Sequence, residues 1–208
     1  MIVFVRGVSI LDILQTVLWM ITSTLVLIST IKYKYPLIPP QAQVIIAAFE
    51  FVTFSFLFIG GQVGFDYISI AYLYWTVIEI VQMVVVIKIG YIKEKRVISY
   101  ILRVIFATGI VHASMLTTEN IYAFSYFNTF IGEIIWFRYI IQSQYPLKPI
   151  VFLTFLAKFV ADLVAISVYV GMGDLVNQVI CVILPVLDFA FLVVFFARMK
   201  AERIKESQ

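Results

Sequence analysis

Hydrophobic residues fill seven long runs of this chain, and short polar or turn-forming segments separate the runs. Each run is close to the ~20 residues that an α-helix needs to cross a hydrocarbon core of about 30 Å. The pattern therefore predicts an all-α integral membrane protein with seven transmembrane helices. The predicted helices lie near residues 8–31, 43–60, 67–89, 97–115, 120–141, 149–170 and 175–198.

Composition and charge narrow the class of protein further. Hydrophobic residues make up 63% of the 208 positions and charged residues 13%, against about 45–50% and 25% in soluble domains. The 15 basic residues against 12 acidic ones give a net charge of only +3, and the basic residues are divided among loops, which excludes a nucleic-acid-binding module. Cys181 is the single cysteine, so an internal disulfide framework and a cysteine-based zinc site are excluded as well. The run 8–31 is too long for the core of a signal peptide and is expected to be retained.

The loop charges predict an orientation in the membrane. One side carries Arg6 alone among basic residues, together with Asp66, Glu119 and Asp174. An excess of Lys and Arg marks the cytoplasmic face, so we expect the N-terminus outside and the C-terminus in the cytoplasm, which requires an odd number of helices. The basic residues of the other side are Lys32, Lys34, Lys88, Lys93, Lys95, Arg96, Arg138, Lys148, Arg198, Lys200, Arg203 and Lys205.

Two similar loop segments indicate an internal repeat. Segments 35–39 (YPLIP) and 145–149 (YPLKP) share four of five residues at an offset of 110 positions, and each follows a hydrophobic run. Glycine-rich turns that end in Asp66 and Asp174 each open the third helix of a repeat. An odd connecting helix returns the chain to its first side, so both triplets cross in the same direction. We expect a first repeat at 1–96, a connecting helix at 97–116, a second repeat at 117–200 and a polar cytoplasmic tail at 201–208.

This layout resembles the superfamily of SWEET sugar carriers, PQ-loop transporters and the KDEL receptor. The pair Pro40-Gln41 is similar to the PQ pair, although it follows the basic loop that the family's pair precedes. Segment 123–126 (AFSY) after Glu119, and Lys158 near a family arginine, are similar to the KDEL receptor. The resemblance implies a fold of two parallel three-helix repeats, and it does not imply a ligand.

Six charged residues fall near the middle of predicted helices. An ionised group at the bilayer centre costs about 2.5–3.5 kcal/mol, so we expect these side chains to face the bundle interior or to be neutral. Lys158 and Asp162 are four positions apart on one helix and can pair, either as a structural lock or at a functional site. The charged residues are Glu50, Glu79, Glu133, Lys158, Asp162 and Asp188.

The remaining intramembrane carboxyls are expected to form pairs between the two repeats. Glu50 would approach the Lys158/Asp162 pair from the first repeat. Glu79 and Asp188 stand at similar heights, nine and ten residues before Lys88 and Arg198, which places one carboxyl in each half. These pairs either serve a ligand or a proton, or donate hydrogen bonds between helices as neutral acids.

Polar side chains form stripes on three helices, and stripes of this kind either hold helices together or line a hydrated cavity. Asn, Thr and Trp side chains suit a small polar ligand with an apolar face, such as a sugar, a nucleoside or an amino acid. Pro185 is expected to kink the last helix one turn before Asp188, as a gating point or as an ordinary structural kink. The stripes are Ser125, Asn128, Thr129, Gly132, Glu133 and Trp136; Asp12, Gln15, Thr16, Trp19 and Ser23; and Tyr72, Trp75, Thr76, Glu79 and Met83.

One segment of the chain matches a known catalytic motif. Segment 171–174 (GMGD) matches the GxGD of intramembrane aspartyl proteases, whose chemistry needs a second Asp that shares a proton. Asp174 falls at the predicted outer edge of the membrane, where the same residues make an ordinary turn and helix cap. We therefore expect no enzyme, no catalytic residue, no cofactor and no metal site.

The sequence predicts a small transporter or facilitator for a small polar solute, linked to protons through intramembrane carboxyl groups. Glu79, Glu133, Asp188 and the Lys158/Asp162 pair would line a path between the repeats. The alternative is a seven-helix receptor or a non-catalytic subunit that binds a peptide or a partner protein. The expected partners are the lipid bilayer, the solute, and a second copy or another membrane protein, and the sequence leaves open which membrane holds the chain.

Overall fold

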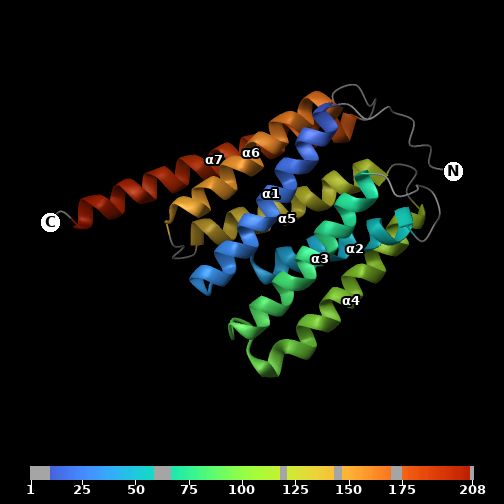
Figure 1. Cartoon of the computed structure of the whole chain (residues 1–208), viewed down its shortest axis with the longest axis horizontal. Coiled ribbons are helices and arrows are strands. Elements are labelled where there is room, and N and C mark those ends of the chain that lie inside the picture. Colours follow the sequence, from blue (N-terminus) through green and yellow to red (C-terminus); the bar gives the residue numbers. More distant parts are fainter. Residues whose placement is uncertain (1–9, 59–66, 118–120, 143–146, 170–174, 207–208) are drawn as a thin grey trace.

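A computed structural model describes residues 10–58, 67–117, 121–142, 147–169 and 175–206, and in these ranges the chain forms seven helices and no strand. The all-helical prediction is confirmed for this part of the chain, and the predicted segments coincide with the observed ones to within a few residues at most ends. The helices are α1 (Ile10–Tyr33), α2 (Pro40–Phe58), α3 (Tyr67–Lys88), α4 (Glu94–Thr117), α5 (Ile121–Gln142), α6 (Pro149–Tyr169) and α7 (Leu175–Glu206) (Figure 1).

The clearest difference from the prediction is the end of α7. The helix continues to Glu206, whereas the hydrophobic run ends at 198, and it projects beyond the bundle in Figure 1. Hydropathy marks where a helix leaves the hydrocarbon, and it does not mark where helical hydrogen bonding stops. The residues after 198 include Met199, Lys200, Ala201 and Glu202, all of which favour a helix.

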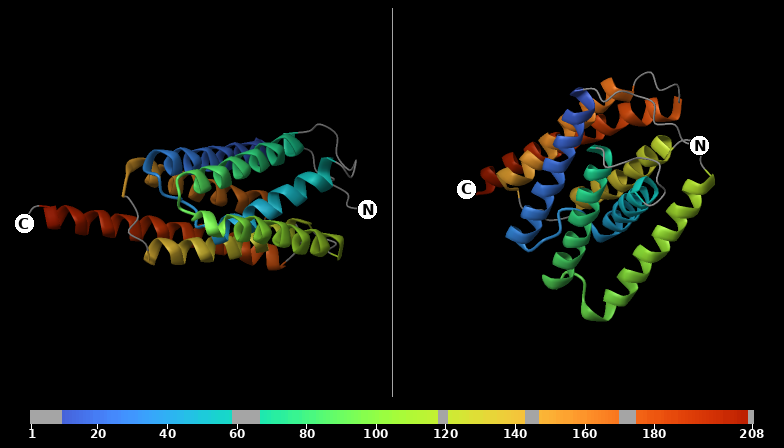
Figure 2. Two further views of the ribbon diagram at one scale, coloured as in Figure 1. Left: turned by 90° about the horizontal axis from the view of Figure 1, so that it is seen from below. Right: turned by 45° about the vertical axis from the view of Figure 1, so that its right-hand side comes forward.

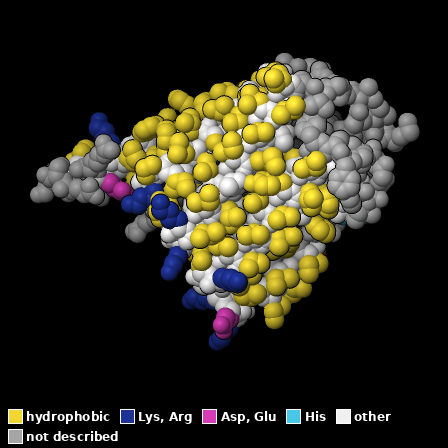
Figure 3. Space-filling view, in the orientation of Figure 1, with side chains coloured by type: hydrophobic (Ala, Val, Ile, Leu, Met, Phe, Trp, Pro, Cys, Tyr) yellow, Lys and Arg dark blue, Asp and Glu magenta, His cyan; other side chains and the backbone are white. Residues whose placement is uncertain are grey.

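Five helices are long and apolar enough to cross a membrane: Ile10–Tyr33, Ser69–Lys88, Glu94–Leu116, Pro149–Ser167 and Gln178–Glu202. Segment Pro40–Phe56 is a shorter apolar helix. Large hydrophobic side chains cover the outer surface shown in Figure 3, and along α4 they include Ile98, Leu102, Ile105 and Phe106. Charged side chains near the middle of the helices, among them Glu79, Lys158 and Asp188, are instead buried inside, which is the arrangement of a membrane protein.

The helices pack as two groups of three, α1 to α3 and α5 to α7, and in each group the last helix lies against the other two. Thus α3 packs against α1 and α2, while α7 packs against α5 and α6. The two groups meet where α1 lies along α6 and α2 lies along α5. Helix α4 packs along α2 on the outside of the bundle (Figure 2).

A close approach of α2 and α5 depends on Gly132. A Cβ atom added at Gly132 would lie 3.5 Å from Cγ1 of Ile46 and 3.7 Å from its Cδ1. These distances are ordinary van der Waals contacts, so there is room for one methyl group and for nothing larger. A small residue at position 132 therefore permits α5 to pack closely against Ile46 of α2.

At the end of the bundle where α1 finishes, three tyrosines from different segments meet. The ring of Tyr35 stacks on that of Tyr139 with centroids 6.0 Å apart and meets Tyr91 edge-on at 5.6 Å. The Tyr139 hydroxyl donates to the carbonyl of Pro36 at 3.3 Å. Tyr91 follows Gly90, whose φ of 75° permits the tight turn between α3 and α4. These contacts join the loops of the first group to α5.

The space beside Gly132 predicts a limit on the size of the side chain at this position. Gly132→Ala should unfold near the wild-type temperature, whereas Gly132→Leu should lose about 1–3 kcal/mol of stability because its side chain overlaps Ile46. Thermal unfolding in detergent measures both variants. Gly109 on α4 has no atom within 4 Å of an added Cβ, so Gly109→Leu is the matched control. Equal unfolding temperatures for the two leucine variants would contradict the size limit.

Candidate functional site

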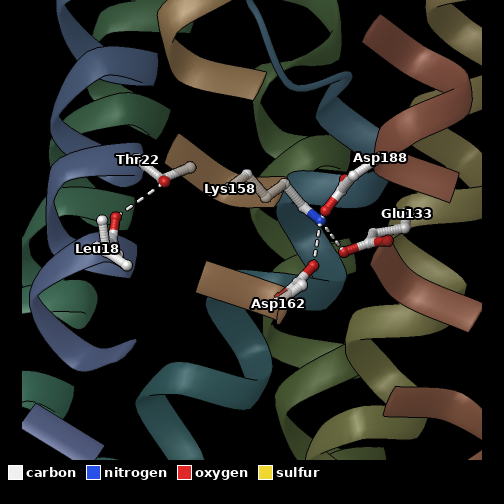
Figure 4. Close-up of polar contacts among 6 residues, drawn as sticks. All are labelled: Leu18, Thr22, Glu133, Lys158, Asp162 and Asp188. Atoms are coloured by element: carbon white, nitrogen blue, oxygen red, sulfur yellow. Dashed lines mark hydrogen bonds and ion pairs between the residues drawn. The ribbon is translucent and has the colours of Figure 1, made fainter. Parts of the chain in front are cut away.

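Four charged side chains from three helices meet in the interior of the bundle (Figure 4). Lys158 on α6 places its Nζ 2.9 Å from Oδ2 of Asp162, one turn further along the same helix. The same nitrogen lies 2.7 Å from Oδ1 of Asp188 on α7 and contacts Oε1 of Glu133 on α5. We call Glu133, Lys158, Asp162 and Asp188 the Lys158 cluster.

The Lys158 cluster is almost completely shielded from solvent and lipid. Lys158 is 1% exposed, Glu133 and Asp162 are 2% exposed and Asp188 is fully buried. The ring of Trp19 on α1 lies under the ammonium group, with its centroid 5.2 Å from Nζ, so a cation–π interaction adds a fourth helix to the site. Each ion is therefore compensated only by groups that the protein itself supplies.

The charges of the cluster do not balance when every group is ionised. Three carboxylates and one ammonium leave a formal excess of two negative charges. Oε2 of Glu133 and Oδ2 of Asp188 are buried and have no hydrogen-bond partner within the described part of the chain. A low-dielectric interior disfavours an uncompensated charge strongly. The site can become neutral by taking up two protons, or by binding a cationic group.

The geometry of the carboxyl oxygens also permits cation binding. One oxygen each from Glu133, Asp162 and Asp188 lies within 4.8 Å of the others. Oxygen ligands from carboxylates are what hard cations prefer, and the lysine nitrogen contacts all three of these residues. The sequence predicts that Glu133, Asp188 and the Lys158/Asp162 pair line one path and that there is no metal site, and it does not predict that all three acids contact Lys158. Lys158 acts here as a tethered cation with which a proton, an ion or an amino group can compete.

An aromatic layer closes one side of the Lys158 cluster. Trp136, Phe155 and Phe191 each stand three positions from a cluster residue, Glu133, Lys158 and Asp188 respectively. The ring centroids of Phe155 and Phe191 lie 5.0 Å apart, and those of Trp136 and Phe155 lie 5.3 Å apart. All three side chains are buried. The layer separates the charged groups from the end of the bundle that holds Tyr35 and Tyr139.

On the opposite side of the cluster, polar residues of α5 stand beside an apolar core cluster of Ile180, Cys181 and Leu184 on α7. Asn128 is buried, and Thr129, one turn before Glu133, is half-buried, as is Trp19. Pro185 lies within α7, buried, one turn before Asp188. Of these residues, Trp19 contacts the cluster directly, through the ammonium group of Lys158, and the role of Asn128 and Thr129 stays a prediction.

Glu79, Glu50 and Trp75 belong to a second polar group between α2, α3 and α4. Glu79 is buried and lines a pocket there, and Glu50 is near enough to interact with it electrostatically. Trp75 packs edge-on against Tyr72 with centroids 5.2 Å apart.

This grouping differs from the predicted pairs. Glu50 accompanies Glu79 instead of Lys158, and Asp188 accompanies Lys158 instead of Glu79. The reason is that α3 packs within the first group of helices and α7 within the second.

Several sequence-based candidates lie outside the described residues. They are Asp66, Glu119, Tyr145, Pro146, the side chain of Ser125 and the GxGD segment 171–174.

In comparisons with known proteins, no family model, no curated protein and no solved structure matches the chain. The site therefore has to be interpreted from its own geometry. Sequence reasoning missed the aromatic layer, because Phe155 and Phe191 stand among many other aromatic residues. The signal that would have found them is the shared spacing of three positions from a charged residue on each of three helices.

The charge imbalance predicts which substitution in the cluster is most harmful. Lys158→Met leaves three buried carboxyl groups without their cation and should cost about 3–5 kcal/mol of stability at neutral pH. Asp162→Asn reduces the negative excess and should cost much less. Lys158→Met/Asp188→Asn should be more stable than Lys158→Met alone, because one repelling charge is gone. Thermal unfolding of the four proteins measures this order, and an unchanged Lys158→Met variant would contradict it.

Proposed function

We propose that the protein is a small multi-pass membrane transporter for a small polar solute, coupled to protons through the Lys158 cluster. The observation that carries the proposal is the excess of two carboxyl groups over cations at a fully buried site. A purely structural site would be better served by one acid for one base, or by apolar residues of similar size. Surplus acids are useful where charge must be taken up and released.

The chemistry that we propose is an exchange of partners at the carboxyl groups. When protons or an amino group of the solute bind to Glu133 and Asp188, Lys158 keeps Asp162, its neighbour on α6, as its counterion. When the proton or solute leaves, Lys158 again neutralises the other carboxylates. Such an exchange lets one site alternate between a loaded and an empty form without leaving an unpaired charge in the bilayer.

The helix packing supports a repeat of three helices, one helix and three helices, with seven spans. Exchanging α1 with α5, α2 with α6 and α3 with α7 leaves the set of packed pairs unchanged, apart from the contact of α4 with α2. We propose on this ground a parallel repeat like that of the SWEET-like superfamily. Lysine and arginine side chains gather at one edge of the molecule in Figure 3, which supports a cytoplasmic position for that end.

The packed aromatic side chains on one side of the Lys158 cluster support alternating access. The aromatic layer and the tyrosine contacts both lie between the cluster and the proposed cytoplasmic end. The polar side with Thr129 and Trp19 would face the outside. We propose that rocking of one helix group against the other opens the aromatic layer, with Pro185 as a bending point in α7.

Solute flux tests the proposed function. Proteoliposomes with an imposed pH gradient should accumulate a labelled sugar, nucleoside or amino acid. Glu133→Gln and Asp188→Asn should each reduce that flux by about tenfold or more, because each removes a group that exchanges partners. Glu202→Gln removes a carboxyl from the exposed end of α7 and should transport normally. Flux that is absent from the wild type, or that is unchanged in the two cluster variants, would contradict the proposal.

A second prediction concerns the accessibility of residues on the two sides of the Lys158 cluster. Cys181 is buried and can be replaced by Ala to give a cysteine-free background. In that background a membrane-impermeant maleimide added outside should label Thr129→Cys, whereas Ile140→Cys, buried beyond the aromatic layer, should stay unlabelled. Solute should change the labelling of Thr129→Cys. Labelling that never responds to any solute would favour the receptor or subunit alternative.

A further inference from the structure

A pocket of about 390 Å³ lies between α3 and α4, and none of its lining residues belongs to the Lys158 cluster. Helix α2 forms its floor, because α3 and α4 both pack along α2; Figure 2 shows α4 standing to one side of the bundle. A volume in this range is that of a small-molecule site. The lining consists of Ala47, Phe51, Thr76, Glu79, Ile80, Met83, Val104, Ile105 and Thr108.

Packed side chains close the pocket at both ends along the helices. Toward the turn between α3 and α4, Val44, Val86 and Tyr100 form a core cluster, and the Tyr100 hydroxyl donates to Oε1 of Gln43 at 3.0 Å. Toward the other end of α4, a second cluster includes Phe49 and Met115. An occupant therefore enters from the side, between α3 and α4.

The side opening faces the same surroundings as the apolar outer surface of the bundle. Phe51, Ile80 and Ile105 line the pocket and are 48%, 52% and 62% exposed. Helices α3 and α4 both include candidate membrane spans, so these side chains face lipid. Glu79 lies nine residues before Lys88, about 13 Å along the helix, which places it deep in the bilayer.

Two polar atoms of the pocket-lining residues have no hydrogen-bond partner in the described part of the chain. Oε2 of Glu79 and Oγ1 of Thr76 are buried, and within the described ranges neither has a hydrogen-bond partner. Both side chains are more than nine-tenths buried. Thr108 is different, because its hydroxyl already donates to the carbonyl of Val104 at 2.8 Å.

The charged residues named in and around the pocket are acidic. None of the nine lining residues is basic, and the nearby Glu50 adds a second acid. The Lys158 cluster contains its own lysine, whereas the carboxyl groups here become neutral either by taking up a proton or by binding a cationic ligand. A cation that reaches this depth through lipid must carry an apolar body or a delocalised charge.

We propose that this pocket binds a lipophilic cation that enters from the bilayer, with its apolar body between Phe51, Ile80 and Ile105 and its charge at Glu79. The ligand class is an amphiphilic amine or an organic cation of delocalised charge. The proposal uses no residue of the Lys158 cluster and does not rest on the proposed transport function.

Two probes of nearly equal shape and opposite charge test the proposal: tetraphenylphosphonium and tetraphenylborate. Binding to the full chain in nanodiscs of zwitterionic lipid is measured by equilibrium dialysis against protein-free nanodiscs. The phosphonium should bind saturably, and tetraphenylborate should show no saturable binding above the empty nanodiscs. Glu79→Gln should weaken phosphonium binding by about tenfold or more.

Matched variants separate the pocket from general effects on the membrane surface. Ile105→Trp fills the opening and should abolish saturable binding, whereas Leu102→Trp, one turn away on the lipid-facing surface of α4 and outside the lining, should bind as the wild type does. Glu94→Gln makes the same chemical change as Glu79→Gln at the exposed start of α4 and should also bind normally. If Glu79→Gln fails to fold, the two tryptophan variants still test whether the cation binds in this pocket.

Three results would overturn the proposal: no saturable phosphonium binding, equal binding of tetraphenylborate, or unchanged binding by Glu79→Gln and Ile105→Trp. Each can be told apart from failure of the transport function. Flux is measured with polar solutes and with substitutions in the Lys158 cluster, whereas this site is measured by binding and by substitutions at α3 and α4.

Discussion

Burial of Lys158 among three carboxyl groups is the constraint on which the bundle depends. An isolated charge in a low-dielectric interior is too costly to persist, so α6 cannot leave α5 and α7 without stranding either the ammonium or the acids. The contacts to Glu133, Asp162 and Asp188 tie three helices to one nitrogen atom, and Trp19 brings α1 to the same point. The packing of Trp136, Phe155 and Phe191 one turn away then follows from that convergence.

The two groups of intramembrane acids handle their charge in different ways. The Lys158 cluster contains its own cation and is sealed by apolar side chains on one side. The group around Glu79 has no basic residue in its lining and opens toward lipid. This difference arises because α4 packs along α2 and leaves a pocket beside α3, whereas α7 packs against both α5 and α6. The same residue type is therefore paired with a buried lysine in one place and lines a pocket without a basic residue in the other.

Hydropathy by itself located the helices, because each run of apolar residues has the length of a membrane crossing and ends at a turn segment. The spacing of residues also predicted the contact of Lys158 with Asp162, since residues four positions apart share one face of a helix. Hydropathy failed at the end of α7, where Lys200 and Glu202 are too polar for a membrane span and yet continue the helix. Hydropathy did not predict that Glu133 and Asp188 both contact Lys158, or that Glu79 lies apart from them. Periodicity shows which face of a helix is polar, and it does not show which helices are neighbours.

The sequence therefore determined the class of protein, the number and limits of the helices in the described ranges, and the presence of charged residues that need partners. Those features follow from local physics: the transfer of apolar residues into lipid and the geometry of one helix. Only the tertiary structure decided which acid meets which base, which side of the site is closed and where a pocket remains. Such contacts join residues that are 25 or more positions apart, as Lys158 is from Glu133 and Asp188, and they are set by how seven similar apolar surfaces pack together.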